Sequence, residues 1–199
     1  MLEIIIMFDE IVFHFINSTL NTSLLNYIFI FFHDCHKNIW FIIPLLFFWI
    51  YNIYINKKNR LQLIILIPLS ILITDQIGSI IKDIELRNRP YMSIDSDEIN
   101  LLVEVAKNKD GTYKNTNSSR KSFPSNHAAN ICALSTILIY LYNNKRKYFL
   151  VIAFLISISR VYIGVHYPVD IMMGAALGIC ISLLIIWLSK KLIRQNIIR

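Results

Sequence analysis

The sequence predicts an all-α membrane protein, with one domain over residues 1–199 built as a six-helix transmembrane bundle. Two observations support this fold class. Hydrophobic residues make up 55% of the 199-residue chain and charged residues only 17%, against about 25% charged residues in soluble domains. Several apolar runs also approach or exceed the roughly 18 residues that indicate a membrane-spanning helix. A soluble helical protein could bury one such run, but not most of its length.

The first predicted element is the hardest to assign. The segment 9–34 begins as an amphipathic run from Asp9 to Asn17 and becomes apolar through Leu24–Phe32. It could be an interfacial helix followed by a short or re-entrant segment, or a complete first span. We favour the complete span, which would place both termini in the cytoplasm. The N-terminus lacks the basic flank of a signal peptide, so we expect this segment to be retained.

Five further apolar segments are each predicted to form one helix, namely 39–56, 61–81, 128–143, 148–163 and 169–189. Basic residues without acidic neighbours fill two short loops and the C-terminal end: Lys57, Lys58, Arg60; Lys145, Arg146, Lys147; Lys190, Lys191, Arg194 and Arg199. Short basic loops remain in the cytoplasm. The net charge of +7 is therefore explained by membrane topology. We expect no nucleic-acid partner.

The loop 83–126 is different, because it carries seven basic and seven acidic residues. We predict that it is external, acts as a lid or a tether, and contains a short interfacial helix at Leu101–Val103. Segment 61–81 starts in the cytoplasm, so Lys82 emerges outside. By the same alternation, His127 and His166 lie outside too. The polar residues near these segment ends therefore meet at the extracytoplasmic face. They form three clusters: Lys82 with Arg89-Pro90, then Pro124-Ser125-Asn126-His127, then Ser159-Arg160 with His166 and Asp170.

These clusters have the composition of a phosphate site. Charged residues beside membrane spans are costly and usually functional. Arg binds phosphate bidentately and Lys acts as a point charge, which makes Lys82, Arg89 and Arg160 candidate ligands. A single Lys at a helix end could instead lie at the membrane interface with its amine in water, without binding phosphate. Arg160 lies well inside an apolar run, where that alternative is weak.

Ser125 is the second residue of the cluster Pro124-Ser125-Asn126-His127, a sequence that is typical of a helix start. The free N–H groups and positive dipole end of a helix N-terminus attract anions. The Ser125 hydroxyl could therefore contribute to a phosphate site, or it could serve only as a helix cap.

Two histidines complete the predicted site. One imidazole can attack phosphorus while the other protonates the leaving oxygen. His166 has Asp170 four residues later to hold its second ring nitrogen, although Pro168 indicates that the helix begins between them. His127 is the second imidazole. The other histidines, His14, His33 and His36, are expected to be interfacial.

No metal site is expected. Cys35, Cys132 and Cys180 lack the spacing of metal ligands or of a disulfide framework. Asp75 is an isolated acid inside segment 61–81; it could hydrogen-bond to a neighbour, and we assign it no role.

The three clusters together resemble the signature of the type-2 phosphatidic acid phosphatase superfamily, also called lipid phosphate phosphatases. That signature reads Lys, six residues, Arg-Pro; then Pro-Ser-x-His; then Ser-Arg, five residues, His, three residues, Asp. The chain matches it with Lys82 to Arg89-Pro90, with Pro124-Ser125-Asn126-His127, and with Ser159-Arg160 to His166 to Asp170. The likeness covers about 82–178. One position departs, because Asn126 stands where the family often has Gly.

The resemblance implies a membrane phosphatase that uses no cofactor and forms a phosphohistidine, and the loop charges predict that its active site is extracytoplasmic. By analogy His166 is the nucleophile, Asp170 orients it, and His127 protonates the leaving group and then activates water. The implied phosphate ligands are Lys82, Arg89, Ser125 and Arg160.

The expected partners are the lipid bilayer and a lipid phosphate substrate in the plasma (inner) membrane; the oligomeric state is left open. Undecaprenyl diphosphate is the first candidate substrate, ahead of phosphatidylglycerol phosphate, phosphatidic acid and lipid A. Two other functions are weaker. An anion transporter would more often show broken helices and repeated halves, and an inactive binding protein would have lost a His or an Arg.

Overall fold

The computed structural model describes residues 2–35, 37–84, 87–95, 97–116 and 119–197, and these residues form helices and connecting loops. The elements are α1 Leu2–His14, a π-helical turn Phe15–Thr19, α2 Ser23–Asp34, α3 Ile39–Ile55, α4 Arg60–Ile84, α5 Pro90–Ser93, α6 Asn126–Leu141, a 3₁₀ turn Asn143–Lys145, α7 Arg146–Tyr162 and α8 Pro168–Ile197. The described loops contain one isolated antiparallel bridge, between Lys107 and Tyr113.

The all-helical membrane fold is confirmed. Each of the five apolar segments forms one helix, namely α3, α4, α6, α7 and α8. Two of them, α4 and α8, are long and apolar enough to cross a membrane on their own. α2 and α3 pass the same test as a pair, bent by 56°. Prolines inside α3 and α4, at Pro44 and Pro68, do not end those helices, as is common in membrane helices.

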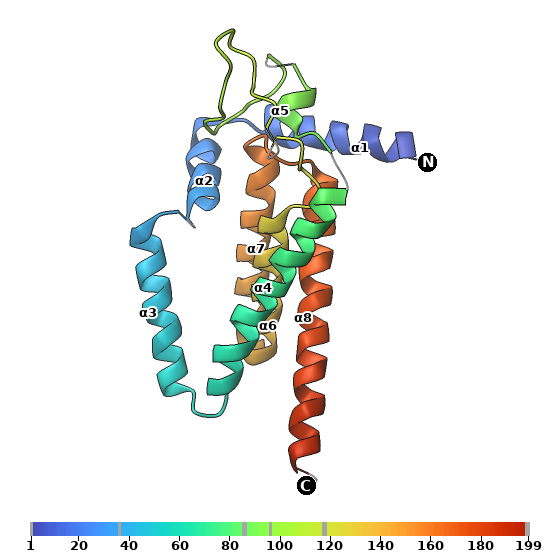
Figure 1. The fold of residues 1–199 in the computed structure, drawn as a ribbon. Helices are drawn as coiled ribbons and strands as arrows, with labels where there is room; N and C mark the ends of the chain where they lie inside the picture. The colour runs from blue at the N-terminus through green and yellow to red at the C-terminus, as the bar shows by residue number, and fades with distance from the viewer. Residues whose placement is uncertain (1, 36, 85–86, 96, 117–118, 198–199) are drawn as a thin grey trace.

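The segment 9–34 does not form the predicted complete span. α1 ends at His14, and α2 is a separate helix of 12 residues, about 18 Å long and too short for a bilayer core of about 30 Å. α1 lies across one end of the bundle, and α2 runs alongside the bundle (Figure 1). The interfacial alternative describes this segment better. Asn17 fixes the break, because its buried amide donates to the carbonyls of Asn100 and Tyr162 at 2.9 and 2.7 Å.

Helices α4, α6, α7 and α8 form the bundle (Figure 1). α6 and α8 approach so closely that glycine is required at their contact. A Cβ atom built on Gly174 would lie 2.4 Å from the Ser125 carbonyl oxygen, and one on Gly178 would lie 2.0 Å from that of Ala129. Both distances are far below any real carbon–oxygen contact. The glycines thereby bring the start of α6 against the start of α8.

The described part of the loop 83–126 packs on the end of the bundle. Leu101, Leu102 and Val103 pack against a buried cluster that includes Phe13 and Tyr162. They do not form the predicted short helix. The Leu102 N–H donates to the Ile163 carbonyl at 3.3 Å, which joins the loop directly to the end of α7.

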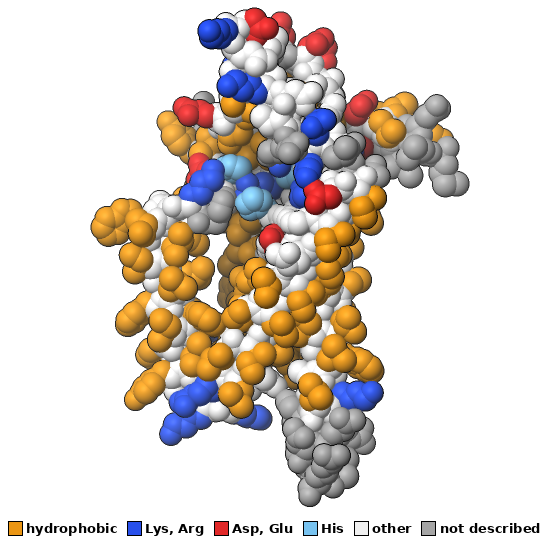
Figure 2. Space-filling view, viewed as in Figure 1, with side chains coloured by type: hydrophobic (Ala, Val, Ile, Leu, Met, Phe, Trp, Pro, Cys, Tyr) orange, Lys and Arg blue, Asp and Glu red, His pale blue; other side chains and the backbone are white. Residues whose placement is uncertain are grey.

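Charge separates the two ends of the molecule. Figure 2 shows Lys and Arg beyond one end of the apolar belt, whereas acidic, basic and histidine side chains gather at the opposite end. The turns joining α3 to α4 and α6 to α7 lie at the first end (Figure 1). The side chain of Arg194 and all of Arg199 lie outside the described residues.

Candidate active site

The turn between α7 and α8 carries His166, and its sequence determines its shape. Gly164 has φ +86°, a left-handed conformation that glycine adopts without strain. The Val165 N–H donates to the Arg160 carbonyl at 3.1 Å, and the Gly164 N–H to the Val161 carbonyl at 3.0 Å. These two bonds form a Schellman motif, which ends α7. The chain then reverses and places His166 just before Pro168, the first residue of α8.

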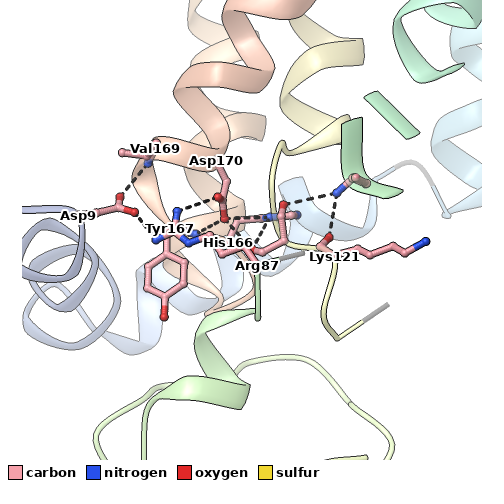
Figure 3. Close-up of polar contacts among 9 residues, drawn as sticks. Asp9, Arg87, Lys121, His166, Tyr167, Val169 and Asp170 are labelled. Atoms are coloured by element: carbon pink, nitrogen blue, oxygen red, sulfur yellow. Dashed lines mark hydrogen bonds and ion pairs between the residues drawn. The ribbon is translucent and has the colours of Figure 1, made fainter. Parts of the chain in front are cut away.

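Asp170 lies beside this histidine, fully buried. Its Oδ2 is 3.5 Å from His166 Nδ1, and it accepts hydrogen bonds from the Ser122 hydroxyl at 2.6 Å and the Tyr167 N–H at 2.9 Å. Its Oδ1 accepts from Arg87 at 3.0 Å. Figure 3 shows Asp170 at the centre of these contacts. Because a carboxylate only accepts, it favours a proton on Nδ1 and leaves Nε2 with a free lone pair.

Burial lowers the pKa of His166 to about 4, against the partial opposing effect of its contact with Asp170. The ordinary imidazole pKa is about 6.5. The imidazole is therefore neutral throughout the physiological range, as a nucleophile must be.

This pKa predicts a pH profile. His166 is the expected nucleophile, and an imidazole loses its nucleophilic form as pH falls through its own pKa. The acidic limb of kcat/KM is therefore expected near pH 4. Activity should accordingly remain substantial at pH 5–6. The measurement is kcat/KM between pH 3.5 and 8, with short assays and correction for inactivation. An acidic limb centred near pH 6.5 in kcat/KM would contradict the neutral buried imidazole.

The environment of Ser125 favours a role in ligand binding over a role as a helix cap. It occupies the N-cap position of α6, yet its hydroxyl makes no capping hydrogen bond. The side chain is completely buried, and its Oγ has no hydrogen-bond partner among the described residues. Leaving a buried hydroxyl unpaired is costly. The Ser125 N–H donates to the Asp170 carbonyl at 3.0 Å, which places this hydroxyl near the His166–Asp170 pair.

Three predicted cations converge here. The positive charges of Lys82 and Arg89 both act on His166, and Arg89 interacts with the like charges of Lys82 and Arg160. Burial lowers the pKa of Arg89 below its usual value. The Lys82 amine donates to the carbonyls of Lys121 and Ser122 at 3.0 and 3.4 Å. Like charges held together in a partly buried site favour the binding of an anion.

Arg160 contacts a histidine that the sequence predicts to be interfacial. Its guanidinium contacts His33, through Nδ1 and through the carbonyl oxygen at 3.3 Å, while its Nε has no hydrogen-bond partner in the described residues. His33 is buried, with 7% of its surface exposed, so its predicted interfacial position is wrong. His14 is half-buried beside Phe13, and His36 lies outside the described residues.

His127 lies in the first turn of α6, next to Ser125, and its side chain is exposed. Exposure allows this imidazole to exchange protons with water. The two histidines thus differ in environment, one buried and one accessible.

Asp75 joins α4 to α6 through hydrogen bonds. Its Oδ1 accepts from the side-chain amides of Asn126 and Asn130 at 3.2 and 3.1 Å, so α4 holds the first turns of α6. Gly78 provides the space, because a Cβ there would lie 2.6 Å from Asn126 Oδ1. The departure at Asn126 is therefore accommodated by residues on α4.

Sequence reasoning missed three residues around Asp170: Asp9, Arg87 and Ser122. Arg87 lies two residues before Arg89, among many other charges, and Ser122 lies two before Pro124. The one sequence signal for Asp9 is an acid within a hydrophobic N-terminal run. No group of three His, Cys, Asp or Glu side chains within the described residues could hold a metal ion. None of Cys35, Cys132 and Cys180 forms a disulfide within the described residues.

Comparison with known families identifies the chain's relatives. The model of the PAP2 superfamily matches residues 62–194, which is more than half of the sequence and includes all three clusters. The chain belongs to the PAP2 superfamily. The predicted family is thereby confirmed.

Relatives within this superfamily carry several names. The chain is 30% identical over 138 residues to the bacitracin transport permease protein BcrC of Bacillus licheniformis, a match covering 69% of this chain and 60% of that protein. It is 33% identical over 84 residues to phosphatidylglycerophosphatase B of Bacillus subtilis, covering 37% and 41%. It is 43% identical over 65 residues to the undecaprenyl-diphosphatase of Sulfolobus acidocaldarius, covering 32% and 31%. The chain thus spans less than two thirds of each of these relatives.

Solved PAP2 structures share the fold. LpxE from Aquifex aeolicus superposes with a TM-score of 0.66 at 24% identity, covering 87% of this chain and 91% of that one. The transmembrane PAP2-type phosphatidylglycerolphosphate phosphatase from Bacillus subtilis gives a TM-score of 0.64 at 23% identity, covering 94% and 87%. These likenesses show that the chain has the same fold as those two proteins.

Proposed function

We propose that this protein is a membrane lipid phosphatase that hydrolyses a lipid phosphate or diphosphate through a phosphohistidine on His166. The observation that carries the proposal is the convergence of three cations and the unpartnered Ser125 hydroxyl on a buried, neutral histidine held by Asp170. A phosphoryl group presents negative oxygens to the cations and an electrophilic phosphorus to Nε2.

In the first half-reaction, Nε2 of His166 attacks phosphorus. The bond from phosphorus to the leaving oxygen breaks, which is the lipid oxygen of a monophosphate or the bridging oxygen of a diphosphate. That oxygen takes a proton from His127. Asp170 accepts from Nδ1 and stabilises the positive charge that the imidazole gains. Lys82, Arg89, Ser125 and Arg160 hold the non-bridging oxygens. Arg160 is drawn away from His33 when the phosphate is bound.

In the second half-reaction, His127 takes a proton from water, whose oxygen attacks the phosphohistidine. The nitrogen–phosphorus bond breaks, inorganic phosphate leaves, and Nε2 regains its lone pair. The exposure of His127 suits this role, because the group must exchange protons in each cycle. The burial of His166 suits the nucleophile, because it excludes water until the leaving group has departed.

The site faces the periplasm or the exterior of the plasma membrane. The support for this side is the charge distribution: the basic turns lie at the end of the bundle opposite the site (Figure 2), and such loops remain in the cytoplasm. The lipid head group would then enter from the outer leaflet.

Undecaprenyl diphosphate is the substrate we propose first, with phosphatidylglycerol phosphate and lipid A as alternatives. Relatives bearing each of these names match the chain. The test is a substrate panel in detergent with excess chelator, comparing a polyprenyl diphosphate, phosphatidylglycerol phosphate, phosphatidate and lipid A. We expect the fastest phosphate release from the polyprenyl diphosphate. Release from none of the four would refute the phosphatase; loss on chelation would refute the metal-free mechanism.

A transport function has one specific observation in its favour, the name of the BcrC relative. Both functions use buried cations, but only hydrolysis uses a nucleophile with a carboxylate partner and a second, accessible imidazole. The same panel separates them. A transporter would bind these anions without releasing inorganic phosphate.

A further inference from the structure

A carboxylate from the N-terminal helix reaches the active-site end of α8. Asp9, on α1, is only 1% exposed. Its Oδ1 accepts the Val169 N–H at 2.8 Å, and its Oδ2 forms an ion pair with Arg87 at 2.5 Å. Val169 is the second residue of α8, where backbone N–H groups have no partner within the helix. Asp9 therefore caps a helix that begins about 160 residues later in the chain.

Arg87 extends this contact to the catalytic carboxylate. One guanidinium nitrogen binds Asp9 and the other binds Asp170 Oδ1 at 3.0 Å. The guanidinium carbon lies 4.0 Å from the centre of the Tyr167 ring, so the ring and the two carboxylates hold it from three directions (Figure 3). The attraction of both carboxylates outweighs the effect of burial and raises the pKa of Arg87.

The pairing determines which oxygen of Asp170 serves the histidine. Because Oδ1 is occupied by Arg87, Oδ2 is left for the Ser122 hydroxyl, the Tyr167 N–H and His166 Nδ1. Without Arg87 the buried carboxylate would lose its closest full positive charge and could rotate. His166 would then lose its fixed acceptor.

We propose that Asp9 and Arg87 are positioning residues of the His166–Asp170 pair, so that α1 is a functional part of the active site. This inference rests on the proposed phosphatase activity. Neither residue touches the phosphoryl group. They act by holding Asp170, and their loss should lower kcat and leave KM nearly unchanged.

Asp9→Asn and Arg87→Gln test the proposal, together with the double variant. Asn at position 9 can still accept the Val169 N–H while losing the ion pair, so the helix cap is kept. We expect each single variant to lower kcat about 100-fold, the effect of a misplaced reacting group. The double variant should be little worse than Arg87→Gln alone, because Asp9 acts through Arg87. Arg87→Lys should recover part of the loss.

A pH profile separates positioning from a general loss of folded enzyme. The groups that face Asp170 are Arg87, His166, Ser122 and the Tyr167 backbone, with Lys82 and Arg89 farther away. Removing the Arg87 charge should move the acidic limb of kcat/KM to higher pH. A merely structural role would lower the active fraction equally at every pH.

Lys121→Gln is the matched control. It removes a nearby positive charge that is paired with Asp83. The Lys121 side chain is 30% exposed and the Asp83 side chain 64% exposed. Solvent screens such pairs, so kcat should stay within about twofold of the unmodified enzyme. Melting temperatures in detergent accompany every variant. If Arg87→Gln does not fold, Asp9→Asn and Arg87→Lys still provide the test.

The outcomes are distinct. An inactive unmodified protein would refute the phosphatase itself. An active protein whose Asp9→Asn and Arg87 variants keep kcat within about threefold would overturn the positioning role alone, given the size expected of a misplaced group. A loss of kcat that follows the folded fraction, with an unshifted pH profile, would overturn it too.

Discussion

The His166→Ala variant is expected to lose about 10⁴- to 10⁶-fold in kcat, the loss seen when a catalytic nucleophile is removed. Alanine has no lone pair with which to attack phosphorus, and the partners of Asp170 cannot replace it. The phosphate ligands would remain, so binding of the lipid should persist. The measurement is phosphate release under substrate saturation, alongside a lipid-binding assay.

His14→Ala is the matched control for this variant. His14 is a half-buried histidine at the end of α1, and its loss should leave kcat nearly unchanged. A His166→Ala enzyme that turns over at a nearly normal rate would rule out His166 as the nucleophile.

The second large effect concerns the contact of α6 with α8. Helix propensity alone predicts that Gly178→Ala stabilises α8 by about 1 kcal/mol. Packing predicts the opposite, because the new Cβ would lie 2.0 Å from the Ala129 carbonyl oxygen and 2.9 Å from its carbon. Forcing atoms into a filled interior costs about 1–3 kcal/mol, and here the obstacle is backbone. We expect packing to win and the melting temperature in detergent to fall by at least about 2–4 °C.

Gly178→Ala should also lower the kcat of the enzyme that remains folded. Separating the helices moves Ser125 and His127 away from His166. Ala176→Val is the control, since Ala176 is exposed on the same helix. An unchanged or raised melting temperature for Gly178→Ala would show that α6 and α8 are farther apart than described.

Local patterns predicted the helices well where hydropathy alone decides them. Segments 61–81 and 169–189 became α4 and α8, with ends within a few residues except for the longer C-terminal end of α8. The predicted single span over 9–34 was wrong because the break between its two helices depends on a distant contact. Asn17 ends the first helical part by hydrogen-bonding Asn100 and Tyr162, and no local pattern reports a partner more than 80 residues away.

The site follows the same division. His166 and Asp170 were predictable because they lie only four positions apart in the sequence, with Pro168 between them marking the start of a helix. Asp9 and Arg87 were not predictable, because they are 78 residues apart in the sequence. They form an ion pair only because α1 lies across the end of the bundle. His33 was misjudged for a similar reason: its partner Arg160 lies 127 residues away.

The reacting bond is the most direct test of the whole account. Radiolabelled polyprenyl diphosphate, carrying the label on its terminal phosphate, is mixed with the enzyme in excess chelator and quenched in alkali within milliseconds. The account predicts an alkali-stable, acid-labile phosphoenzyme whose label maps to His166 and is absent from His166→Ala. Phosphate released with no labelled enzyme at any quench time, or a label on another residue, would contradict it.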